Sequence, residues 1–121
     1  MDAEKWTYDE LIGKIAQGGI PALVFIVVMG STELVGAAAI TATLAILGGP
    51  FGVVGGLVTF GLLVMISKGI AKYGVRAIFE GVLKNLYDKG YSKEEILKKV
   101  HQMKVSRKMK AKLNTYIDDF K

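Results

Sequence analysis

A run without any charged side chain extends from Leu34 to Ser67 and constrains this sequence more than any other feature. The residues Gly48, Gly49 and Pro50 stand near its middle, where glycine and proline are typical of a break between two helices. The run therefore predicts two apolar helices joined at Gly48, Gly49 and Pro50, that is, a helical hairpin. Such a hairpin either inserts into a bilayer or forms the core of a small bundle, and the pattern leaves both open.

The composition agrees with one small, strongly apolar domain. The chain has 121 residues, 51% of them hydrophobic, and its mean hydropathy is +0.38. It contains no cysteine, which excludes disulfides, thiolate nucleophiles and thiolate zinc sites. No spacing typical of a catalytic triad, a carboxylate pair or a metal site occurs. We therefore expect a protein that is not an enzyme and uses no cofactor, no metal and no small-molecule substrate.

Several short signals predict where helices begin and end. Thr7 with Glu10 and Ser92 with Glu95 have the spacing of capping boxes, and Ser106 is a candidate N-cap. Pro21 suits the first turn of a second helix. We predict an all-α fold, a compact bundle of five or six helices around a central apolar helical hairpin. Residues 1–121 form a single helical domain, with the hairpin at about 20–67 and amphipathic basic helices at about 68–120; residues 20–47 form one helix or two.

The charged residues after the apolar run recur every fourth position. They are Lys68, Lys72, Arg76, Glu80, Lys84 and Asp88. This spacing predicts that one helix begins after Pro50, continues through the amphipathic part and ends at Gly90.

The net charge of +5 is unevenly distributed. Residues 84–112 alone carry ten lysines and arginines against three acidic residues. This distribution favours an anionic membrane as the partner and makes nucleic acid a weaker candidate, because no nucleic-acid motif accompanies it. The residues predicted to bind the membrane surface are Lys68, Lys72, Arg76, Lys98, Lys99, Lys104, Arg107 and Lys108.

Glu33 is the one charged residue between Lys14 and Lys68. It is a candidate switch for membrane insertion, because a carboxylate near an apolar hairpin changes its charge with pH. The alternative is a hydrated junction between two helices, with Glu33 near a helix N-terminus, and we favour that interpretation.

Residues 46–79, ILGGPFGVVGGLVTFGLLVMISKGIAKYGVRAIF, carry a family resemblance. An Ile-Leu-Gly-Gly turn, a glycine-rich apolar helix and a basic Ile-Ala-Lys stretch resemble the latter half of circular and leaderless bacteriocins. The resemblance implies a saposin-like bundle with a cationic face that binds and permeabilises membranes. It covers about a quarter of the chain, and the region after Gly90 has no counterpart in it.

We therefore expect a membrane-active, bacteriocin-like protein that binds anionic lipid through its basic face and inserts the apolar hairpin, alone or as a homo-oligomer. The alternatives are a constitutive integral membrane protein of holin or immunity type and a soluble, non-enzymatic helical bundle. The acidic start of the chain lacks the basic n-region of a signal peptide. We accordingly expect a membrane-associated protein of a bacterial host that is secreted, if at all, without a signal peptide.

Overall fold

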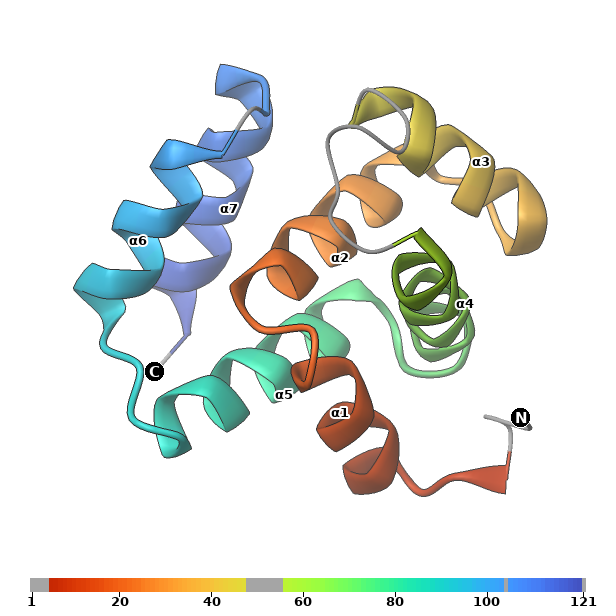
Figure 1. The fold of residues 1–121 in the computed structure, drawn as a ribbon, viewed down its shortest axis with the longest axis horizontal. Coiled ribbons are helices and arrows are strands. Elements are labelled where there is room, and N and C mark those ends of the chain that lie inside the picture. The colour runs from red at the N-terminus through yellow and green to blue at the C-terminus, as the bar shows by residue number, and fades with distance from the viewer. Residues whose placement is uncertain (1–4, 48–55, 104, 121) are drawn as a thin grey trace.

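The computed structural model describes residues 5–47, 56–103 and 105–120 and contains helices only in these ranges (Figure 1). Its seven helices are α1 (Tyr8–Ala16), α2 (Ile20–Thr32), α3 (Gly36–Ile46), α4 (Gly56–Tyr73), α5 (Val75–Asp88), α6 (Lys93–Gln102) and α7 (Arg107–Asp119). The all-α prediction is confirmed. The predicted count of five or six helices is too low, and the predicted turn at Gly48, Gly49 and Pro50 lies outside the described residues.

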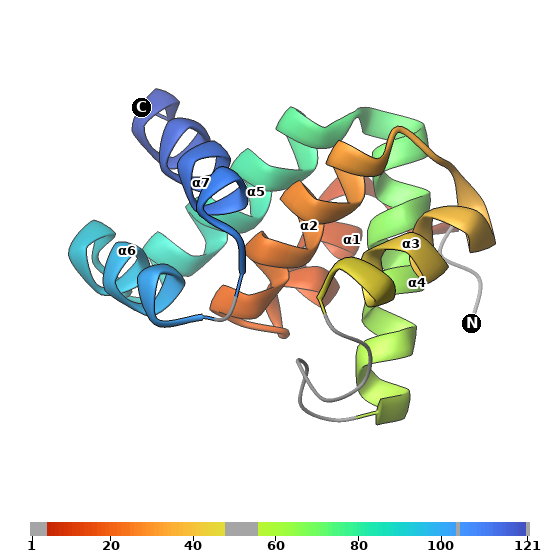
Figure 2. The same cartoon turned by 90° about the horizontal axis from the view of Figure 1, so that it is seen from above.

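The helix α2 is the centre of the fold. It packs against each of the other six helices, and Figures 1 and 2 show α6 and α7 on one side of it and α3 and α4 on the other. Every residue from Ala22 to Met29 is buried. A helix that is apolar on all faces is stable in water only when neighbours surround it, and here they do.

The centre of the bundle therefore differs from the predicted apolar hairpin. Of the predicted hairpin region, α2 alone is enclosed, while α3 packs mainly against α2 and α4 at the edge. The buried residues of α3 are Ala39, Ile40 and Thr43. These small and medium side chains bury little area, so the physical reason for the peripheral position is that α3 has less apolar surface to hide than α2.

Residues 20–47 form two helices, because α2 ends at Thr32. The hydroxyls of Ser31 and Thr32 donate to the carbonyls of Val27 and Met29, at 2.8 and 2.7 Å. Glu33 then adopts a left-handed conformation with φ of 57°. Glu33 is thus an exposed C-terminal cap of α2, which fits the hydrated junction but places the residue at a helix C-terminus.

The predicted long helix from Pro50 to Gly90 is wrong, because the chain turns at Gly74. Gly74 has φ of 91°, a conformation that glycine adopts without steric cost, and it separates α4 from α5. The end of α5 is as predicted: the amides of Gly90 and Tyr91 donate to the carbonyls of Tyr87 and Leu86, which is a Schellman motif.

The predicted N-terminal caps are confirmed. Thr7 and Ser92 each form a complete capping box, and the Ser106 hydroxyl accepts from the Met109 amide. Hydrogen bonds from Thr7 hold the pKa of Glu10 below its usual value. These local contacts fix the starts of α1, α6 and α7, and hence the direction in which each helix meets α2.

Within the described residues, no single helix is both long and apolar enough to cross a membrane. The helices α1 and α2 satisfy the length and composition criteria only as a pair, and they meet at an angle of 115°.

Candidate functional site

The exposed large apolar side chains of the described residues fall mainly in one stretch of the chain, residues 34–60. Leu34, Val35, Ile46 and Phe60 leave 47%, 74%, 52% and 52% of their surface accessible. All four belong to α3, α4 or the residues just before α3. Tyr91, at 38%, is the one other described large apolar residue in this class. Single exposed apolar residues are ordinary, but their concentration on one segment is typical of a lipid or protein contact.

The residues between these four carry no charge. The outward positions of α3 are occupied by Gly36, Ala37, Ala38, Thr41 and Ala45, all exposed. The result is a smooth surface of small side chains, with Val35 at one end of α3 and Ile46 at the other. We call the exposed residues 34–38, 41, 45, 46 and 60 the apolar surface.

Two of the predicted cations border this surface. Lys68 and Lys72 line a groove of about 420 Å³ that also includes Trp6 and Gly36, the first residue of α3. The ammonium of Lys72 lies 5.3 Å from the ring centre of Tyr73, and that of Lys14 lies 5.8 Å from the ring of Trp6. Cations and amphipathic aromatic rings beside an apolar surface are the arrangement found at a membrane interface.

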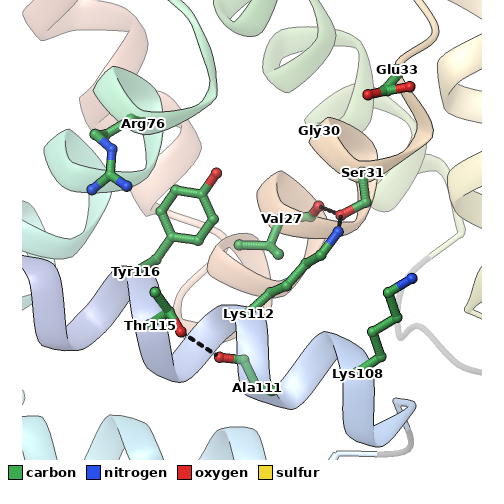
Figure 3. A pocket seen from close by; sticks show the side chains of 10 residues that line it. All are labelled: Val27, Gly30, Ser31, Glu33, Arg76, Lys108, Ala111, Lys112, Thr115 and Tyr116. Carbon is green, nitrogen blue, oxygen red and sulfur yellow. Dashed lines mark hydrogen bonds between the residues drawn. The ribbon is translucent and has the colours of Figure 1, made fainter.

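Two others of the predicted cations line a different site. Arg76, at the start of α5, and Lys108, in the first turn of α7, line a cleft of about 540 Å³ beside the end of α2 (Figure 3). Lys112 and Tyr116 complete the α7 wall of this cleft, and Glu33 lies at its α2 end. We call this the basic cleft.

Lys112 and Tyr116 are not among the residues predicted from the sequence to bind the membrane surface. Lys108, Lys112 and Tyr116 are four residues apart, so they share one face of α7. That spacing was a usable signal. The apolar residues on the adjacent face, Leu113 and Ile117, leave only 0% and 1% of their surface exposed, and their burial holds α7 in place.

The remaining predicted cations are not gathered with these. Lys98 and Lys99 are exposed on α6, and Arg107 is exposed at the start of α7. Lys104 lies outside the described residues. The structure thus divides the predicted basic residues into a pair beside the apolar surface, a pair in the basic cleft and exposed residues of α6 and α7.

The chain was compared with protein-family models, with curated proteins and with solved structures, and none of the three comparisons gave a match.

Proposed function

We propose that this protein is a membrane-active helical protein of the bacteriocin-like kind. It binds anionic lipid through its basic residues and inserts the segment of α3 and the apolar part of α4, which permeabilises the bilayer. The single observation that carries this proposal is the apolar surface, where Leu34, Val35, Ile46 and Phe60 stand exposed on a segment without charge.

The charge distribution supports lipid as the partner of this surface. Lys68 and Lys72 lie at the border of the apolar surface, next to Gly36. Each basic residue near the surface of an anionic membrane contributes about 1 kcal/mol of attraction. Apolar burial and cation attraction would therefore act at adjacent places on the same segment.

The backbone at both ends of the segment supports its movement as a unit. Glu33, before α3, and Gly36, its first residue, have φ of 57° and 61°, and Gly74 has φ of 91° after α4. Hinges are a few residues at the ends of elements that absorb large changes in φ and ψ. Rotation at these two places would move α3 and α4 while leaving the other helices in contact with one another.

The first experiment measures dye release from vesicles by protein purified without detergent. We expect release from vesicles rich in phosphatidylglycerol, little release from zwitterionic vesicles, and suppression by salt, since surface attraction is screened within about 10 Å at 0.1 M salt. A protein that needs detergent throughout would instead favour the constitutive membrane protein. A detergent-free protein that releases no dye would contradict the proposal.

A cysteine pair tests whether the segment must leave the bundle. A β-carbon at position 18 would lie 2.7 Å from a methyl of Leu62 in α4, so the side chains at these positions are neighbours. The chain has no other cysteine, and Gly18→Cys with Leu62→Cys can therefore form only one internal disulfide. We expect the oxidised variant to bind vesicles without releasing dye and the reduced variant to release it.

The reduced form of the same variant is the matched control, because both forms carry the same loss of Leu62. Equal dye release from the oxidised and reduced forms would overturn insertion of α4. It would leave binding by the apolar surface to be judged from the vesicle affinity alone.

A further inference from the structure

We infer that the basic cleft is a phosphate-binding site. The side chains of the cleft by themselves indicate a phosphate site, and a lipid headgroup as the source of the phosphate rests on the proposed function. A soluble phosphate compound is the other source of the same chemistry, and the experiments below separate the two.

Three cations from two helices line the cleft, against one carboxylate. They are Arg76 from α5 and Lys108 and Lys112 from α7, and the carboxylate is that of Glu33. Among the described residues, Glu33 forms no ion pair with any of them. The cleft therefore holds positive charge that its own carboxylate does not neutralise.

The partner of Lys112 is neutral. Its ammonium donates to the hydroxyl of Ser31 at 3.1 Å in a partly buried position, and that hydroxyl donates onward to the carbonyl of Val27 (Figure 3). An ammonium has three donors, so Lys112 keeps donors for a ligand. Taking a cation partly out of water is costly unless an anion compensates it, and a bound phosphate would supply that anion.

Arg76 is held beside the cleft but is weakly paired. Its guanidinium lies 5.1 Å from the ring centre of Tyr116 and is 3.5 and 3.6 Å from the carboxylates of Asp119 and Glu80. These are long, half-exposed ion pairs of the kind that contribute little energy. The aromatic contact orients the planar guanidinium, whose fork of donors suits phosphate oxygens.

Lys108 and Tyr116 supply groups without partners inside the described structure. The Lys108 ammonium has no ion pair or hydrogen bond there, and neither has the Tyr116 hydroxyl, which points toward the cleft in Figure 3. Lys108 also lies in the first turn of α7, which contains no acidic residue. A cation at the positive end of a helix dipole is unfavourable, and a bound anion would reverse that effect.

The set of donors fits phosphate better than carboxylate. One guanidinium, two ammonium groups and a phenol hydroxyl can serve more than two oxygens, and a phosphate group presents at least three that accept hydrogen bonds. The volume of about 540 Å³ accommodates a phosphate with a small organic group attached.

The position of the cleft explains how a lipid phosphate would reach it. Glu33 lines the cleft, and the next two residues are Leu34 and Val35, the first members of the apolar surface. A headgroup phosphate held in the cleft would therefore lie beside the start of the apolar surface, along which its acyl chains would extend. The two surfaces would bind different parts of one lipid molecule.

The first test titrates the protein with inorganic phosphate and with glycerol 3-phosphate and follows the amide NMR signals of α7. We expect saturable shifts at Lys112 and Tyr116. Lys112→Met and Lys108→Met should each weaken binding about tenfold, the effect of one charge-assisted hydrogen bond. Glu33→Gln should strengthen it, because it removes the negative charge of the cleft.

Lys98→Met is the matched control. It removes the same charge from an exposed position on α6 outside the cleft, so it should change binding less than twofold, within the weak effect of a surface charge. Lys98→Met and Lys112→Met variants that weaken binding equally would overturn the cleft and indicate only general electrostatic attraction.

The second test measures vesicle binding with phosphatidylglycerol and with an anionic lipid that carries a carboxylate and no phosphate, at equal charge density. Saturable binding to the soluble compounds supports a soluble phosphate ligand. Cleft-dependent binding to phosphatidylglycerol vesicles alone supports the headgroup. If Lys112→Met weakens binding neither to the soluble compounds nor to the vesicles, the inference is overturned. Dye release that persists in Lys112→Met would then leave the proposed function standing.

Discussion

The apolar surface makes a quantitative prediction through Phe60. This residue keeps 52% of its surface exposed, and an aromatic side chain has roughly 150–250 Å² in all, so about 100 Å² of Phe60 is free to enter lipid. At about 25 cal/mol per Å² the gain is about 2.5 kcal/mol. We therefore expect Phe60→Ser to weaken vesicle binding roughly thirty- to seventyfold, somewhat less than the full value because serine retains some area.

The assay is a titration with phosphatidylglycerol vesicles followed by the fluorescence of Trp6, the single tryptophan of the chain. Tyr91→Ser is the control, since Tyr91 is 38% exposed but follows α5, away from the apolar surface. The thermal unfolding temperature of both variants should stay within a few degrees of the unaltered protein, because neither residue is in the core. A Phe60→Ser variant that binds within twofold of the unaltered protein would refute the assignment of this surface to lipid.

Three further predictions concern the fold. In a urea titration, Gly81→Ala should lower the free energy of unfolding by about 1–3 kcal/mol, because the new β-carbon would lie 2.8 Å from Ile12 and would also meet the Tyr8 hydroxyl. Gly61→Ala is the control: the space around Gly61 is open, so this change should stabilise α4. Gly74→Ala should cost about 1–3 kcal/mol through its positive φ alone, and a D-alanine at this position in a synthetic chain should remove that cost. Burial, aided by nearby acidic groups, raises the pKa of Tyr8 in the folded protein. The contribution of neutral Tyr8 to the free energy of unfolding is therefore complete below pH about 10 and is lost as the pH rises through the higher folded pKa. A Tyr8→Phe variant should show a flatter profile of stability against pH at alkaline pH.

The bond that Tyr8 makes gives the alkaline prediction a structural basis. Its hydroxyl donates to the Ala77 carbonyl at 2.6 Å and so joins α1 to α5. Ionisation removes that donor. A stability profile that does not change between the unaltered protein and Tyr8→Phe above pH 10 would contradict this reasoning.

Local sequence rules predicted the helix ends well. The Thr7 and Ser92 capping boxes, the Ser106 cap and the end of α5 before Gly90 all depend on residues within five positions of each other. The periodic stripe of α7 was likewise readable, because Leu113 and Ile117 lie one helical turn apart and both are buried. Short-range geometry is contained in a short stretch of sequence, so these features needed no knowledge of the partners.

The break at Gly74 was not predicted, because the four-residue spacing of charges continues unchanged across it. Arg76 and Glu80 form an ion pair four residues apart within α5, while Lys68 and Lys72 belong to α4. Glycine permits a turn but does not require one. The turn is selected by the packing of α5 against α1 and α2. The free energy that this packing contributes exists only in the folded chain.

The sequence by itself determined that this chain forms helices, where most of them begin and end, and that residues 34–67 carry no charge. Only the tertiary structure decided that α2 takes the centre while α3 and part of α4 remain at the surface. It also placed Arg76 and Lys112, which are 36 positions apart in the sequence, in the lining of one cleft. The physical reason is that several apolar helices share a core of limited size. The helix α2 carries more apolar surface to bury than α3, but how much each helix buries follows only from the packing of all the described helices against one another.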